Sequence, residues 1–171
     1  RLVWEENADL MEAFTSRETE ISGALAEHYG ITRVEDGFTR YPMPPERVGF
    51  LTQGAVMAAR TVNPTSSMID RGLFVLNDVF CDSVPHPDSD ALRDAIEEQA
   101  VPETSGLSQR QRFAMQSEDP LCASCHGKFD PLGLPFETFD PAGAFITEDE
   151  HGNALTGHGV VTLDGVEVAY D

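Results

Sequence analysis

The sequence predicts a mainly α-helical protein that ends in a short β-hairpin. Apolar residues recur at helical spacing in several segments of the first two thirds of the chain. Near the C-terminus, two runs with alternating valines flank Asp164-Gly165, a dipeptide typical of a two-residue hairpin turn. A Cys-x-x-Cys-His motif at residues 122–126 adds a specialised module to this helical framework.

The first thirty residues are expected to form two helices. Apolar residues at approximately helical spacing predict the first one: Leu2, Trp4, Leu10, Met11 and Phe14. Thr15-Ser16-Arg17-Glu18 has the pattern of a capping box, which predicts the start of the second helix. Tyr29-Gly30 is expected to end it, with the glycine just beyond the last helical turn.

The middle of the chain alternates apolar helices with proline-rich breaks. Residues 31–47 contain three prolines and are expected to be a loop, and residues 48–60 to be helical. Residues 68–80 have the apolar pattern of a buried helix. A proline- and acid-rich linker follows over residues 85–106, interrupted by a short acidic helix at 89–100.

A helix at roughly 108–117 leads into the cysteine motif. After the motif, closely spaced prolines and glycines predict mostly turns through about residue 143. His151-Gly152-Asn153 is expected to form a further turn before the hairpin. We therefore expect three sections: a helical segment at 1–47 that ends a preceding domain, a helical module with its linker at 48–106, and the motif-bearing module at 107–171.

Cys122-Ala123-Ser124-Cys125-His126 is the attachment signature of a c-type haem. In such motifs the two thiols add across the haem vinyl groups and the histidine becomes the proximal iron ligand. A zinc site would need a second ligand pair at close spacing, and His151 and His158 are seven residues apart. A thiol redox pair would need a thioredoxin-like strand-to-helix setting, which is absent from the sequence pattern. The motif therefore predicts one covalent haem c.

The residues around the motif resemble a known family. Residues 119–133 and 136–140 resemble the block "DPxCxxCHxxMDPLGFxxExFD" of the large planctomycete-type multi-domain c-type cytochromes. Residues 49–54, 63–66 and 71–76 resemble the upstream segment "GLLTxxS…NPxxTSPxxRGxWVL", and residues 25–30 resemble "LAxHYG". The resemblance implies an exported, haem-bearing protein with a cytochrome c-like haem module at its C-terminal end.

The chain departs from that family pattern at two places. Phe129 replaces the usual methionine, so this side chain is not available as an iron ligand. The family's long proline run is reduced to Pro85 and Pro87, and Cys81 occupies a position where some members have a cysteine. The partner of Cys81 stays open.

The second axial ligand decides between electron transfer and small-molecule chemistry. No methionine follows Cys125, which excludes the usual downstream ligand of small cytochromes c. His28 is the first choice, because the resemblance places a histidine at this helix end, although a histidine there also suits the helix dipole. The remaining candidates are His158, His151, Met115, His86, Met43, Met57 and Met68.

Apolar residues after the motif are expected to form the haem wall, or simply the core. They are Pro131, Leu132, Leu134, Phe136 and Phe139. Glu137 and Asp140 could form a carboxylate pair, but nothing nearby indicates glycosidase or metal chemistry, so we expect them on a solvated face.

The charge balance limits the partners. Eleven basic against thirty acidic residues give a net charge of −19, which disfavours nucleic acids and anionic membranes. The acidic surface is either simply solvated or a docking face for a basic redox partner. No apolar run approaches the roughly 20 residues of a membrane span. Arg1 lies inside an expected helix, so we expect a fragment or a processed product.

These observations lead to three hypotheses. The first is a c-type cytochrome that relays electrons within a larger redox protein or complex. The second is a haem-based redox enzyme with an open or exchangeable distal site, and the third is an interaction subunit whose haem is structural. Haem attachment to this motif implies maturation outside the bacterial cytoplasmic membrane, so we expect a periplasmic or extracellular protein.

Overall fold

The computed structural model describes residues 5–32, 37–62, 67–84, 90, 94 and 106–170. The chain divides into two compact units, each of which is described here by itself. Unit 1 comprises residues 1–67 and 139–146, and unit 2 comprises residues 68–138 and 147–171. The chain therefore contributes a late segment to unit 1 before it returns to unit 2.

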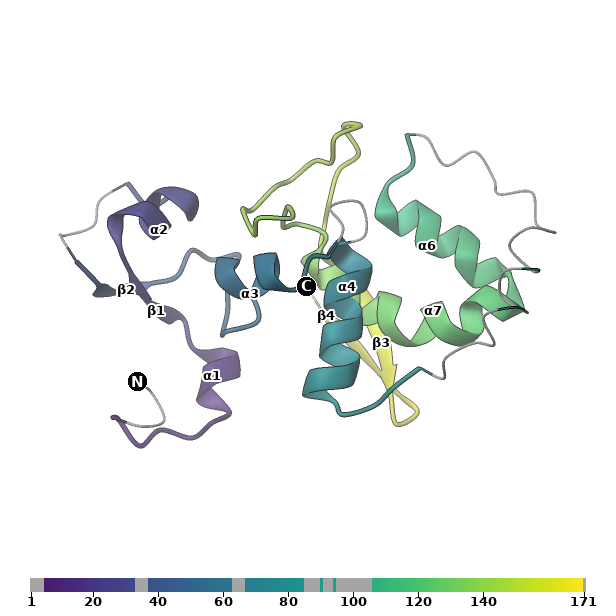
Figure 1. The fold of residues 1–171 in the computed structure, drawn as a ribbon, viewed down its shortest axis with the longest axis horizontal. Coiled ribbons are helices and arrows are strands. Elements are labelled where there is room, and N and C mark those ends of the chain that lie inside the picture. Colours follow the sequence, from purple (N-terminus) through teal and green to yellow (C-terminus); the bar gives the residue numbers. More distant parts are fainter. Residues whose placement is uncertain are drawn as a thin grey trace. The chain divides into compact units, whose positions relative to one another are not determined.

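Unit 1 is built on a pair of short strands and three short helices. Its elements are α1 (Glu12–Thr15), β1 (Glu18–Ile21), α2 (Gly23–His28), β2 (Thr39–Pro42) and α3 (Gly54–Ala59) (Figure 1). β1 and β2 pair antiparallel, with Glu18 opposite Pro42 and Ile21 opposite Thr39. Ile21, Ala26 and Tyr29 are buried and form its core, against which Leu25, Ile31 and Tyr41 pack.

A buried arginine joins segment 139–146 to the rest of unit 1. Arg47 is 0% exposed and donates hydrogen bonds to the carbonyls of Thr52 (2.6 Å) and Gly143 (2.5 Å). Its guanidinium lies 4.0 Å from the centre of the Tyr29 ring and 4.9 Å from that of Phe139. Burial lowers the pKa of Arg47 from its ordinary value. Two carbonyls and two aromatic faces thus surround this buried cation, while its Nε has no hydrogen-bond partner among the described residues.

The predicted capping box at Thr15–Glu18 is wrong, because this segment runs from the last residue of α1 to the first residue of β1 and starts no helix. The backbone of Ser16 and Arg17 pairs across the chain, accepting hydrogen bonds from the amides of Gly49 (2.8 Å) and Met43 (2.7 Å). These long-range bonds override the local capping signal. The helix expected in the first fourteen residues is reduced to α1, and residues 1–4 lie outside the described part.

The predicted end of α2 at Gly30 is confirmed. The amide of Gly30 bonds to the carbonyl of Glu27 (3.0 Å), and that of Ile31 bonds to the carbonyl of Ala26 (2.8 Å). Gly30 has a φ of 69°. This pair of bonds with a left-handed glycine is the Schellman arrangement that ends many helices.

Unit 2 contains the longer helices and the C-terminal hairpin. Its elements are α4 (Ser67–Phe74), η2 (Val75–Val79), α6 (Gln109–Glu118), α7 (Pro120–Gly133), η3 (Leu134–Phe136), β3 (Gly159–Leu163) and β4 (Val166–Tyr170). Only the first residue of α4, Ser67, is counted in unit 1. Helix α7 contacts α6, η2, η3 and β3 (Figure 1). It is therefore the central element of this unit.

Two glycines let α4 and α7 approach at backbone distance. A Cβ atom on Gly72 would collide with the carbonyl oxygen of Phe129, and one on Gly133 would collide with the carbonyl oxygen of Met68. A glycine inside a helix costs roughly 0.5–1 kcal/mol relative to alanine. The close packing of the two helices requires both glycines in spite of this cost.

The turns predicted after the cysteine motif are replaced by helix as far as Phe136, and turns are found only from residue 137 on. α7 continues through Pro131 to Gly133, and η3 follows directly. The carbonyl of Pro131 would normally accept from the amide four residues on, but residue 135 is also a proline and has no N–H. The hydroxyl of Tyr170 donates to this carbonyl instead, at 2.7 Å. The last residue of β4 is thereby tied to α7.

The predicted fold class, mainly α with a cytochrome c-like haem module, is wrong. The described residues combine helices with two separate two-stranded antiparallel sheets, which is a mixture of α and β structure. The β3–β4 hairpin is confirmed, with Leu163 opposite Val166 and positive φ values at Asp164 (50°) and Gly165 (78°). The β1–β2 sheet was not expected, because its strands have four residues each and β2 lies in the proline-containing segment interpreted as a loop.

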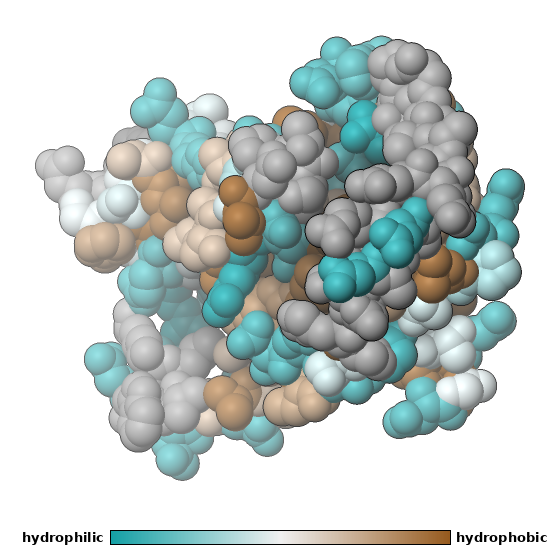
Figure 2. All heavy atoms as spheres, turned by 45° about the vertical axis from the view of Figure 1, so that its right-hand side comes forward, coloured by the Kyte–Doolittle hydropathy of each residue, from teal (hydrophilic) through white to brown (hydrophobic). Residues whose placement is uncertain are grey.

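Two other helix predictions are confirmed, whereas the helix predicted at 48–60 is limited to Gly54–Ala59. The buried helix at 68–80 corresponds to α4 and η2, and the helix at 108–117 corresponds to α6. The acidic helix predicted at 89–100 lies almost entirely outside the described residues. Within the described part, no helix is both long and apolar enough to cross a membrane. Figure 2 shows hydrophilic residues over much of one face, with smaller hydrophobic areas between them.

Candidate functional site

The cysteine motif lies at the beginning of α7. The Asp119 side chain caps the helix by accepting hydrogen bonds from the amides of Leu121 (2.7 Å) and Cys122 (3.2 Å). Pro120 occupies the first helical turn, where its missing N–H leaves no partner unsatisfied. These local signals fix the helix start two residues before the first motif cysteine.

The helix places the three motif side chains on one face. Cys122, Cys125 and His126 are spaced i, i+3 and i+4, and residues at these spacings are neighbours on a helix surface. All three are half-buried. The two thiols are free cysteines. A group bound to this face would therefore meet two thiols and an imidazole together.

The next residue on the same ridge, Asp130, holds the imidazole. His126 Nδ1 lies 2.9 Å from Asp130 Oδ2, and Asp130 is 0% exposed. This geometry suits the neutral tautomer in which Nδ1–H donates to the carboxylate and Nε2 keeps its lone pair. The Phe129 ring lies with its centre 4.8 Å from that of His126. The imidazole thus has one nitrogen available as a metal ligand.

The surroundings of Cys122 do not favour a thiolate. Burial, and after it the nearby Asp119, raise the pKa of the Cys122 thiol above its ordinary value. Cysteines used in thiol–disulfide chemistry usually have a lowered pKa, because the thiolate is the reactive form. The electrostatics around Cys122 are therefore the opposite of those of a reactive redox thiol.

The described residues contain no group of three or more His, Cys, Asp or Glu side chains arranged to hold a metal ion. The motif residues nevertheless fit a haem c. They would supply two thiols for the tether and one imidazole nitrogen for the iron, the one that does not face Asp130. Because such a haem brings its own iron, the fit does not need a preformed ligand cluster.

The residues expected to form the haem wall divide between the two units. Leu132, Leu134 and Phe136 are buried in unit 2, with 7%, 5% and 8% of their surface exposed, and Pro131 is half-buried. Phe139 is buried in unit 1. Their contact with a haem stays a prediction.

The candidates for the second axial ligand also divide between the units. His28, Met43 and Met57 belong to unit 1, Met68, Met115, His151 and His158 belong to unit 2, and His86 lies outside the described residues. Met57 and Met68 are 1% and 2% exposed and are core residues. Met43 Sδ accepts a hydrogen bond from Gln53 (3.2 Å). His151 and His158 are exposed, and His151 lies 3.6 Å from Glu150.

His28 lies in the last turn of α2. It lines a pocket of about 690 Å³ in unit 1, together with Tyr41, Met43 and Arg47. Its ring centre is 5.8 Å from that of Tyr29. This environment offers both aromatic and polar contacts, and the role of His28 as an iron ligand stays a prediction.

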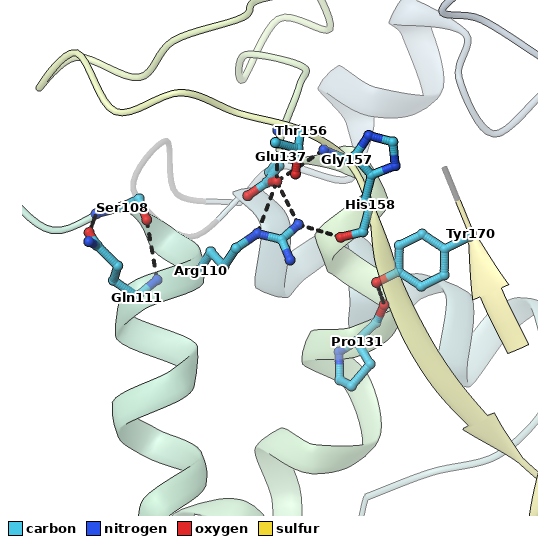
Figure 3. Close-up of polar contacts among 9 residues, drawn as sticks. All are labelled: Ser108, Arg110, Gln111, Pro131, Glu137, Thr156, Gly157, His158 and Tyr170. Carbon is cyan, nitrogen blue, oxygen red and sulfur yellow. Dashed lines mark hydrogen bonds and ion pairs between the residues drawn. The ribbon is translucent and has the colours of Figure 1, made fainter. Parts of the chain in front are cut away.

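A buried carboxylate that sequence reasoning missed links α6 to the segment before β3. Glu137, expected on a solvated face, is 8% exposed. Its Oε1 accepts hydrogen bonds from Arg110 (2.7 Å from Nη2) and from the amides of Thr156 (3.2 Å) and Gly157 (3.1 Å) (Figure 3). Arg110 also donates to the carbonyl of His158 (2.6 Å). This cluster fastens the segment before β3 to α6.

Two signals in the sequence could have revealed these residues. Glu137 lies within the apolar stretch Leu134–Phe139, where a carboxylate needs buried partners. Asp130 lies four residues after His126, which is the right spacing for contact only if the helix continues. The contact between Asp130 and His126 was not predicted, because turns and not a helix were expected after the motif.

Comparison with known proteins identifies the family. The family model described as "PSCyt3: Protein of unknown function (DUF1588)" matches residues 47–149, which is more than half of the chain. This domain is cytochrome-related and occurs in planctomycete-type cytochrome c proteins. The chain belongs to the PSCyt3 family. No curated protein and no solved structure matches it.

Proposed function

We propose that this chain carries one haem c, attached through Cys122 and Cys125, and relays electrons within a larger redox protein or complex. The observation that carries the proposal is the arrangement on α7. Two half-buried thiols share a face with His126, whose Nδ1 is engaged by buried Asp130 and whose Nε2 is left available. Membership of a cytochrome-related family supports the same conclusion.

A bound haem c supplies a reversible one-electron couple. The chain's own residues would bind and orient it: the two thiols of α7 would tether the porphyrin, and His126 would provide a nitrogen ligand for its iron. The close packing of α7 on α4 at Gly72 and Gly133 holds these side chains on a rigid element. Buried Leu132 and Phe136 would exclude water from the adjoining wall, together with half-buried Pro131.

Covalent attachment is tested by intact-mass measurement after expression with a c-type maturation system. The wild-type chain should gain the mass of one haem, and a Cys122→Ser, Cys125→Ser double variant should gain none. Cys81→Ser is the matched control, because Cys81 is exposed and lies outside the motif. A wild-type mass without haem, or haem retained by the double variant, would overturn the proposal.

His28 is the proposed second axial ligand. Replacing it in the holoprotein by His28→Ala should convert a low-spin visible spectrum into a high-spin one that responds to carbon monoxide. His151→Ala, which removes an exposed histidine of unit 2, should leave the spectrum unchanged. A wild-type protein that is already high-spin would instead favour the redox enzyme with an open distal site.

The location and partners follow from the same proposal. Haem attachment to a Cys-x-x-Cys-His motif takes place on the outer side of the bacterial cytoplasmic membrane, so the protein would be periplasmic or extracellular. Its net charge of −19 suits a basic redox partner, since opposite charge speeds the encounter of two proteins.

A further inference from the structure

Asp130 is an unusually placed carboxylate. It is 0% exposed, and its Oδ2 contacts His126 Nδ1 at 2.9 Å. No donor among the described residues bonds to its buried Oδ1. The residue that follows it, Pro131, has no N–H to offer.

The stability of α7 does not explain this residue. A buried charge costs folding free energy unless its hydrogen bonds are complete, and Asp130 has one oxygen without a described partner. A neutral side chain of similar size would avoid that cost. A neutral side chain of that size would lack one feature of Asp130, which is the contact between its carboxylate and His126.

The contact has a chemical consequence for the imidazole. A carboxylate that accepts from Nδ1–H fixes the tautomer and the ring orientation, and it raises the basicity of Nε2 more than a neutral acceptor would. A more basic ligand, with a negative charge behind it, stabilises the more positively charged, oxidised state of a metal centre.

We infer that Asp130 is a positioning residue that orients His126 and lowers the reduction potential of the centre it serves. This inference rests on the proposed haem attachment. It adds that the protein lowers the reduction potential of the bound haem. Asp130→Asn tests it, because asparagine keeps the size and one acceptor oxygen but removes the charge.

The experiment compares three holoproteins by spectroelectrochemistry: wild type, Asp130→Asn and the control Asp82→Asn. Asp82 is an exposed carboxylate of the same unit, 3.8 Å from Lys128 of α7, so its variant removes an equal charge away from His126. The midpoint potential of Asp130→Asn should rise clearly above those of the other two proteins. Equal shifts in the two variants would show that Asp130 acts only as a remote charge and would overturn the inference.

A pyridine haemochrome assay on each sample separates this outcome from failure of the proposed function. Absence of haem c from the wild type contradicts the haem proposal, whereas normal haem content with an unshifted Asp130→Asn potential contradicts only the Asp130 inference. A second measurement needs no variant. In the reduced, low-spin protein, the His126 Nδ1 proton should exchange slowly and appear downfield by NMR; exchange as fast as in a free imidazole would overturn the inference.

Discussion

At the scale of single residues, Tyr170 donates a hydrogen bond to a helix carbonyl that two prolines leave without its usual donor. Pro131 and Pro135 are separated by four positions, so the carbonyl of the first loses its normal helical donor. The Tyr170 hydroxyl supplies the missing hydrogen bond at 2.7 Å. Partial burial raises the pKa of this hydroxyl, which keeps it in the protonated form that can donate.

Tyr170→Phe should therefore destabilise the protein by about 1–2 kcal/mol, because it leaves the Pro131 carbonyl without its donor. The free energy of unfolding from urea titrations measures this loss. A variant as stable as wild type would mean that water replaces the hydroxyl without cost.

The same side chain predicts a pH dependence. The folded-state pKa of Tyr170 is raised, so its contribution is complete below the unfolded value of about 10 and is lost as the pH rises toward the folded value. Between the unfolded-state and the folded-state pKa of Tyr170, the free energy of unfolding of the wild type should fall more steeply with pH than that of Tyr170→Phe. Parallel curves for the two proteins would contradict the assignment.

At the scale of elements, helix α6 shows that a capping box determines a helix start where no long-range backbone hydrogen bonds compete with it. Ser108 and Gln111 form a reciprocal capping box, in which the Gln111 amide bonds to Ser108 Oγ (3.2 Å) and the Ser108 amide bonds to Gln111 Oε1 (2.8 Å) (Figure 3). The apparent capping box at Thr15–Glu18 has no such effect, because Ser16 and Arg17 bond to a distant part of unit 1. The same kind of signal thus succeeds or fails according to tertiary context.

Ser108→Ala should lower the free energy of unfolding by about 1 kcal/mol through loss of the cap. Ser117→Ala is the matched control in the same helix, because the Ser117 hydroxyl bonds back to the Phe113 carbonyl and caps nothing. Chemical denaturation followed by far-UV circular dichroism gives both values. Equal losses in the two variants would show that the Ser108 bonds add no stability.

At the scale of the whole molecule, net charge is the dominant long-range property. The chain carries −19, and hydrophilic residues cover much of the face in Figure 2. A field of one sign accelerates the approach of oppositely charged reactants, and salt screens it over about 8–10 Å at physiological ionic strength.

A cationic one-electron reagent should therefore exchange electrons with the holoprotein faster at low salt than at high salt, and an anionic reagent should show the reverse trend. Stopped-flow rates over a range of ionic strengths measure both. The same salt dependence for the two reagents would contradict an electrostatically guided encounter.

Local signals in the sequence locate the motif residues and the C-terminal hairpin, but not the sheet or the buried carboxylates around them. The thiols and His126 are visible in the motif because their spacing is local, and the C-terminal hairpin is visible because Asp164-Gly165 is a local turn signal. The β1–β2 pair depends on contacts between distant segments, and burial of Asp130 and Glu137 depends on packing in unit 2. Such long-range relations leave little trace in one sequence.

The central claim is one covalent haem c on α7, and the pyridine haemochrome spectrum of the purified chain tests it most directly. The chain should be exported and expressed with a c-type maturation system. We predict one haem c per chain that survives acidified organic extraction. A spectrum without haem c, or a haem that is fully extracted, would contradict the account.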